Sequence, residues 1–145
     1  MSVDEFFRLI YDEMNVEHFS GALPPVTFTV GISGLSLEAH GPGVRGEMFR
    51  CADCGWVISI AERLIADGAD LDGFKATMLH EMVHLKMRTL SPLDYDGKSH
   101  GPSFAAECNR IGAALGIPSV YACDDVPCPA EYEKCNYWPL PQRND

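Results

Sequence analysis

The spacing of apolar residues predicts a helix at the start of the chain. Ser2 and Glu5 form a capping-box pattern, and the helix should run from there to about His18. Its apolar face is made by Phe6, Phe7, Leu9, Ile10 and Met14. Pro24 and Pro25 then exclude any continuation of the helix.

Alternating patterns predict strands in the next part of the chain. Val26, Phe28 and Val30 alternate with threonines, as in a half-buried strand. Residues 45–50 form a weaker strand pattern, and apolar residues alternate again over 56–60. The short segment 51–55 between them predicts a hairpin turn. Residues 31–43 are rich in glycine and serine and should form a loop.

Two further helices are predicted in the second half of the chain. Asp72 is the expected N-cap of a helix that runs to about Arg88. Apolar residues surround most of this helix, which should therefore be largely buried: Phe74, Met78, Leu79, Met82, Val83 and Leu85. Pro102 opens the last helix, which should end at Leu115 before Gly116. A helix, three strands and then helices indicate a compact α+β fold.

The composition limits the classes of protein to which this chain can belong. The chain has 145 residues, of which 46% are hydrophobic, enough for one domain with a real core. We expect this domain at 1–118, with an irregular tail rich in proline and cysteine at 119–145 packed on it. No run of about 18 apolar residues occurs, and the acidic start of the chain does not resemble a signal peptide. The expectation is a cytoplasmic monomer without membrane association.

The most informative segment is His80-Glu81-Met82-Val83-His84. On a helix, positions four residues apart lie about 40° apart around the axis and about 6 Å apart along it. Both imidazoles can then bind one zinc ion, and the glutamate beside them can accept a proton from water. Because buried histidines and glutamates need partners, the apolar surroundings favour a metal site over a helix that carries two histidines by chance.

A catalytic zinc site needs a third protein ligand. His100 stands at the entry to the last helix, and the preceding loop lets the chain turn back toward the first two histidines. Glu107 in that helix is the rival candidate, since some zinc hydrolases use a glutamate from a following helix. His18 and His40 are expected to be ordinary surface or packing residues.

Three segments in this order resemble the SprT-like zinc metallopeptidases, the family that includes the Spartan-type proteases. The resemblance covers roughly residues 3–117. It rests on Asn15 to Phe19 followed by Gly21-Ala22-Leu23-Pro24, on Met78 to His84, and on His100-Gly101-Pro102-Ser103-Phe104. It implies a zincin-like peptidase domain with His80, His84 and His100 as zinc ligands and Glu81 as general base. The implied reaction is peptide-bond hydrolysis by an endopeptidase through a metal-activated water.

The acidic composition bears on partners. Eleven basic and 21 acidic residues give a net charge of −10. The resemblance implies association with DNA, whereas this charge disfavours it because the nucleic-acid backbone repels an acidic surface. We expect a protein or peptide substrate, which an edge strand of the hairpin could bind by strand addition. Tyr95 is a candidate for stabilising the oxyanion.

The six cysteines raise the question of a second metal. Cys51 and Cys54 have the spacing of half a zinc knuckle. The tail carries Cys123, Cys128 and Cys135 but no Cys-x-x-Cys pair of the kind found in many relatives. The hypothesis is a second, structural zinc that joins tail and hairpin; the alternative is reduced cysteines without metal.

Two other functions stay open at this point. One is a non-catalytic, zinc-stabilised binding module that retains the protease fold. The other is a zinc hydrolase that acts on a bond other than a peptide bond. An intact Glu81 argues against the binding module, because a purely structural metal does not require that carboxylate.

Overall fold

The computed structural model describes residues 1–40, 44–66, 71–92 and 100–116, without the side chains of residues 39 and 40. Within these residues the helices and strands are α1 (Val3–Phe19), β1 (Thr27–Val30), α2 (Gly34–His40), β2 (Gly46–Cys51), β3 (Gly55–Ile60), the 3₁₀ helix η1 (Glu62–Leu64), α3 (Leu71–Thr89) and α4 (Pro102–Leu115). The α+β class is confirmed. The boundary predicted at 118 and the tail lie outside the described residues.

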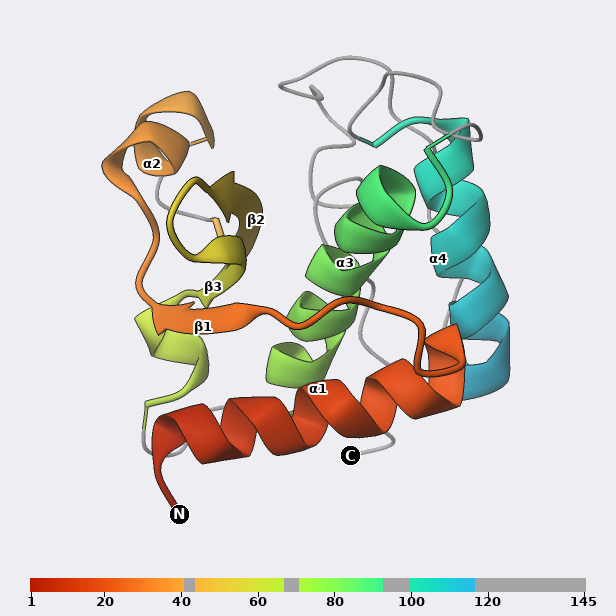
Figure 1. Ribbon diagram of the computed structural model, residues 1–145, viewed down its shortest axis with the longest axis horizontal. Helices are drawn as coiled ribbons and strands as arrows, with labels where there is room; N and C mark the ends of the chain where they lie inside the picture. The colour runs from red at the N-terminus through yellow and green to blue at the C-terminus, as the bar shows by residue number, and fades with distance from the viewer. Residues whose placement is uncertain (41–43, 67–70, 93–99, 117–145) are drawn as a thin grey trace, which may run out of the picture.

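The three strands form one sheet in the order β1-β3-β2. β1 pairs with β3 in parallel, and β2 pairs with β3 as the antiparallel hairpin that the sequence predicts. β3 is therefore the central strand. Figure 1 shows α3 between this sheet and α4, with α1 crossing below, and α3 contacts β2, β3, α4 and α1.

The helix α3 is the structural centre of the molecule. Its apolar residues join the core at the predicted positions, and Met78, Met82, Val83 and Leu85 are fully buried. A helix that is apolar on nearly every side must be covered on nearly every side. The neighbours on three sides provide that cover, and any polar side chain that α3 carries inward must find a partner there.

The start of the chain is fixed by side-chain hydrogen bonds. Ser2 and Glu5 form the predicted capping box of α1. Buried Asn15 donates to the carbonyl of Leu23 at 3.3 Å and accepts from its N–H at 3.1 Å. The Tyr11 hydroxyl donates to the carbonyl of Pro24 at 2.6 Å. These bonds turn the chain after α1 and lead it into β1, which gives the Asn…Leu-Pro segment a physical role.

Several predictions about local structure are wrong. Residues 31–43 contain α2, held by the side chain of Glu47, which accepts from the N–H of Ser33 at 2.9 Å and from the hydroxyls of Ser33 and Ser36. Asp72 is not an N-cap, because α3 already begins at Leu71. The sequence pattern alone could not predict α2, because the Glu47 side chain that holds it comes from a strand later in the chain.

The predicted burial of some side chains on α1 and β1 is also wrong. Leu9 is 52% exposed, although it lies at an apolar-face position of α1. Val30 is 44% exposed at the end of the edge strand β1. On the central strand β3, Val57 and Ser59 are buried along with Ile58 and Ile60. A central strand has neighbours on both edges and can be covered on both faces, so alternation there does not mean half-burial.

Among the described residues, no helix is both long enough and apolar enough to cross a membrane.

Candidate metal centre

Three histidines meet at α3, two from this helix and one from the segment that leads into α4. His80 and His84 stand one turn apart on α3, and His100 lies just before α4. The Nε2 atom of His100 is 3.2 Å from that of His84 and 3.3 Å from that of His80. Gly101 and Pro102 begin α4 at this point, which brings His100 back against α3. The structure thus assembles the three histidines that the sequence singles out.

The spacing of the three nitrogen atoms fits a tetrahedral metal. Zinc–imidazole bonds of about 2.0–2.1 Å at tetrahedral angles place two ligand nitrogens about 3.3–3.4 Å apart. The two Nε2 separations of 3.2 and 3.3 Å match this value closely. Candidate ligand atoms of His80, His84 and His100 all lie within 4.8 Å of one another. The group could therefore hold a metal ion.

His80 and His84 are in the protonation state that a metal requires. Burial lowers the pKa of His84 to about 3, with the His100 and Arg88 charges as further causes. Burial also lowers the pKa of His80 well below its usual range, and His84, His100 and Arg45 contribute. Both rings are therefore neutral at neutral pH. Neutral imidazole keeps a lone pair for a metal ion and does not repel it.

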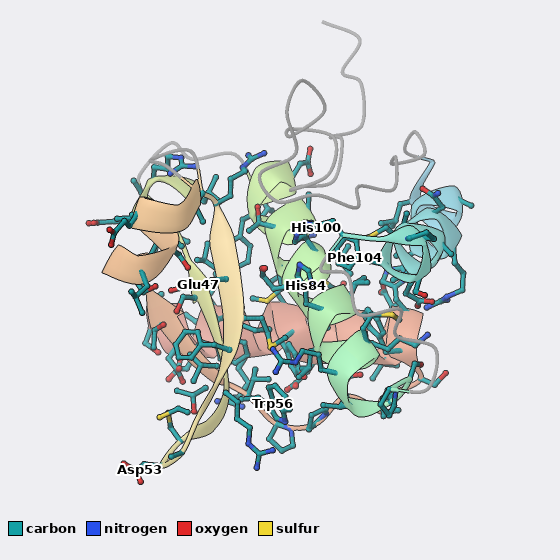
Figure 2. The ribbon with its side chains drawn as sticks, turned by 90° about the horizontal axis from the view of Figure 1, so that it is seen from above. Glu47, Asp53, Trp56, His84, His100 and Phe104 are labelled. Atoms are coloured by element: carbon teal, nitrogen blue, oxygen red, sulfur yellow. The ribbon has the colours of Figure 1, made fainter. Side chains whose placement is uncertain are left out.

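Phe104 packs against all three imidazoles. Its ring stacks on His84 with centroids 4.4 Å apart, and it approaches His80 and His100 edge-on at 4.9 and 5.1 Å. Figure 2 shows His84, His100 and Phe104 gathered where α3 meets α4. The phenyl ring is only 3% exposed. Phe104 lines the apolar base of the cluster, a role that the sequence motif contains but does not reveal.

Glu81 is buried next to this cluster and has an unused acceptor. Its side chain is 3% exposed, and Oε2 has no hydrogen-bond partner among the described residues. Burial raises the pKa of its carboxyl group to about 8, and the charge of Glu47 adds to the shift. An unpartnered carboxyl oxygen in an apolar interior costs stability, and such groups concentrate at functional sites.

The strand β2 passes directly over Glu81, and Gly46 makes this approach possible. A Cβ at Gly46 would lie 2.8 Å from Cγ2 of Thr77 and 3.3 Å from Cγ of Glu81. A larger residue at this position would force Thr77 or the strand itself to shift. The site therefore has the backbone of β2 on one side and the start of α4 on the other.

Glu107, the rival ligand, is occupied elsewhere. Its Oε1 lies 3.0 Å from Nζ of Lys86 and accepts from Nε of Arg110 at 2.9 Å. Burial alone would raise the pKa of its carboxyl group, but hydrogen bonds from Arg110 and Lys86 outweigh burial and lower it. Arg110 also donates to the carbonyl of His18 at 2.7 Å. Glu107 thus joins α4 to α3 and α1 and is not part of the histidine group.

Other candidates are separate from this centre or outside the described residues. The His18 side chain lies beside Glu17, 3.7 Å away, on α1. Tyr95 and the tail cysteines Cys123, Cys128 and Cys135 lie outside the described residues, so their proposed roles stay predictions.

Comparison with known proteins agrees with the geometry. A search among curated proteins finds no match. The family model described as SprT-like family matches residues 10–124, which include the second half of α1, the sheet, the three clustered histidines and Glu81. Because this match spans most of the chain, the protein belongs to the SprT-like family.

Proposed function

We propose that this protein is a zinc-dependent peptidase. The observation that carries the proposal is the pairing of three converging imidazoles with a buried carboxyl oxygen that has no partner among the described residues. Membership of the SprT-like family supports the same chemistry. His80, His84 and His100 hold the metal, and Glu81 acts on the proton of the attacking water.

Zinc is the metal that this ligand set suits best. Three imidazoles with an open fourth position are the ligands of several catalytic zinc sites, whereas magnesium and calcium prefer oxygen ligands. When bound, zinc supplies Lewis acidity, which makes water more acidic and the scissile carbonyl more electrophilic.

Glu81 is the general base of the proposed reaction. Without a metal its raised pKa keeps it protonated at neutral pH. A nearby cation favours the ionised form, because opposite charges within a few ångströms lower the pKa of a carboxyl group. The carboxylate takes a proton from water as the water attacks the peptide carbonyl. It then gives this proton to the leaving amine, so that the bond breaks without expelling an amide anion.

The strand β2 offers a means of positioning the substrate. Of its two edges, one pairs with β3, and no other described strand pairs with the second. An extended peptide can add to such an edge through backbone hydrogen bonds. Because Gly46 brings β2 onto Glu81, a peptide along this strand would lie beside the proposed base.

The test is Glu81→Gln, which keeps the shape of the side chain and removes its basicity. Hydrolysis of an unfolded protein substrate should fall by about 10²–10⁴-fold, since general-base catalysis is typically worth that much. Zinc content should stay unchanged, because Glu81 is not among the converging ligands. Glu62→Gln on the exposed surface of η1 is the matched control and should retain full activity.

Full activity in Glu81→Gln would refute the catalytic role of this carboxyl group. A wild-type protein that binds zinc yet hydrolyses no peptide would instead favour the non-catalytic binding module.

A further inference from the structure

Two arginines stack on one tryptophan where β2, β3 and α3 come together. Arg50 of β2 is the cross-strand partner of Trp56 on β3, and Arg88 comes from the last turn of α3. The guanidinium carbons of Arg50 and Arg88 lie 5.4 and 5.6 Å from the centroid of the Trp56 ring. Both arginines are exposed and Trp56 is half-buried, so the ring holds two cations at the surface.

This arginine–tryptophan cluster lies on the same face of the hairpin as the candidate metal centre. Side chains at alternate positions of a strand point to the same face, so Arg50 shares a face with Gly46. Gly46 lies against Glu81, which makes this the face toward α3. Figure 2 accordingly shows Trp56 on the same side of the hairpin as His84.

The spacing along β2 and α3 gives the distance from the cluster to the proposed base. Arg50 is four residues from Gly46, about 13 Å along an extended strand. Arg88 is seven residues from Glu81, about 10 Å along a helix. The strand and the helix therefore run side by side in the same direction, with the cluster about 10–13 Å from Glu81. An extended peptide covers about 3.3 Å per residue, so a side chain three or four residues from the scissile bond would reach the cluster.

Neither Arg50 nor Arg88 pairs with a carboxylate among the described residues. The chain has 11 basic and 21 acidic residues, so acids are plentiful, yet two like charges share one ring here without an acid. An anion that contacts both guanidinium groups would relieve their mutual repulsion. A guanidinium group matches the planar fork of a carboxylate and can donate two parallel hydrogen bonds to it. The cluster therefore suits a carboxylate that a ligand brings.

The tip of the same hairpin has no comparable arrangement within the described ranges. Cys51 and Cys54 are free thiols there, and no third described residue is close enough to share an ion with them. The second, structural zinc that their spacing suggests stays a prediction.

We propose that Arg50, Arg88 and Trp56 form a subsite for an acidic side chain of the peptide substrate, three or four residues from the scissile bond. The substrate class is thus a peptide or unfolded segment with aspartate or glutamate at that distance. The inference rests on the proposed peptidase function, because the distance is counted from Glu81. Nucleic acid is the weaker candidate, since it carries a charge on every nucleotide and a chain of net charge −10 repels it more strongly than a peptide with one acidic residue.

The experiment compares matched peptides on the zinc-loaded full chain. A cleavable sequence is selected from a mixture of random peptides, and mass spectrometry identifies the scissile bond. Versions with glutamate or glutamine at the third or the fourth residue, on each side of that bond, then differ in one charge. Glutamate at one of these positions should raise kcat/KM about tenfold, mainly through KM, because hydrogen bonds between charged groups are worth about that factor. The gain should shrink at high salt.

Variants of the two arginines test the subsite directly. Arg50→Gln with Arg88→Gln should remove the preference, so that kcat/KM becomes equal for the two peptides. Arg50→Glu with Arg88→Glu should reverse it in favour of lysine at the same position, which a merely structural role would not produce. Arg8→Gln is the matched control and should keep the preference, because Arg8 stacks on Phe28 instead, 5.3 Å from the ring centroid. Zinc content is measured for each variant, since Arg88 lies one turn from His84.

Capture from the same peptide mixture by zinc-loaded Glu81→Gln protein gives a readout without hydrolysis. The captured peptides should be enriched in acidic residues, and Arg50→Gln with Arg88→Gln should abolish the enrichment. Equal cleavage of the glutamate and glutamine peptides would overturn the subsite and leave the peptidase function standing. Absence of any cleavage would refute the proposed function, and captured peptides without acidic enrichment would then overturn the subsite as well. A single-stranded oligonucleotide that binds through the two arginines more tightly than the glutamate peptide would assign the cluster to nucleic acid and overturn the proposal.

Discussion

Two buried polar clusters lie between α3 and α4, and they differ in how completely their groups are paired. At Glu107 one carboxylate faces two cations, Lys86 and Arg110. At the histidine cluster, three imidazoles turn their Nε2 atoms toward one another, and Oε2 of Glu81 has no partner among the described residues. The first cluster is complete without any ligand. The second contains a buried oxygen that no described residue pairs, which is the physical basis for treating the first cluster as structural and the second as functional.

The largest effect should come from breaking the histidine cluster. His84→Ala removes one of three ligands, and hydrolysis should fall by at least about 10³-fold because the Lewis acid is lost. Zinc at this site should be lost with it. His18→Ala is the control, since His18 lies outside the cluster. Retained zinc and hydrolysis in His84→Ala would contradict the assignment of the site.

Breaking the Glu107 cluster should lower the stability of the protein and leave its activity unchanged. Glu107→Ala leaves Lys86 and Arg110 without their shared partner, and we expect a loss of about 2–3 kcal/mol in the free energy of unfolding. This is below the usual cost of breaking a buried ion pair, because Arg110 is about half exposed. Denaturant unfolding gives the loss directly. Activity per folded molecule should be unchanged, and a large fall in it would mean that the two clusters are coupled.

The pH dependence of the metal-free protein should separate the histidines from Glu81. The lowered pKa values of His80 and His84 mean that the unfolded state binds more protons below about pH 6.5, so stability falls on acidification toward pH 3. Glu81 acts in the opposite direction: its raised pKa means that the folded state binds more protons between about 4.5 and 8, so stability falls as pH rises through that range.

Stability of the metal-free wild type should therefore peak near pH 6.5. On the alkaline side it should fall by up to about 1.4 kcal/mol per pH unit until the folded pKa of Glu81 is passed. Denaturant unfolding across pH, with wild type and Glu81→Gln side by side, provides the measurement. The variant should lack the alkaline decline and lose stability more steeply in acid. An alkaline decline of equal size in both proteins would assign it to another group.

The smallest effect should come from Phe104→Leu, which retains an apolar side chain and removes the ring. Aromatic pairs contribute about 0.5–1.5 kcal/mol beyond their buried area. Zinc affinity, measured by competition with a chelator, should weaken about fivefold, with the pH dependence of binding retained. Phe104→Tyr should restore part of the affinity by restoring the ring. Equal affinity in wild type and Phe104→Leu would show that the ring only fills space.

The sequence was most predictive where structure depends on local spacing. The apolar periodicity located α3, and Pro102 and Gly116 marked the two ends of α4. Two histidines one turn apart on a helix necessarily lie on the same face. Prediction failed where the structure depends on contacts between residues that are distant in the sequence. α2 depends on Glu47 of β2, and the exposure of Val30 depends on the position of β1 at the edge of the sheet. The pairing of Glu107 with Arg110 is local, but Lys86 and the His18 carbonyl reach it only through folding.

The role of Phe104 shows the same limit within the site. Its place in the His-Gly-x-x-Phe segment is visible in the sequence, but its contact with His80 and His84 exists only because α4 packs on α3. Likewise, only the packed structure shows that Gly46 allows β2 to lie against Glu81.

The central claim is that His80, His84 and His100 bind one zinc ion and leave a position open beside Glu81. Anomalous diffraction at the zinc edge, from crystals of the zinc-loaded full chain, tests it most directly. We expect a peak within bonding distance of the three Nε2 atoms, about 2.0–2.1 Å, with no fourth protein ligand. A peak elsewhere, or a fourth side chain closing the coordination at this cluster, would contradict it.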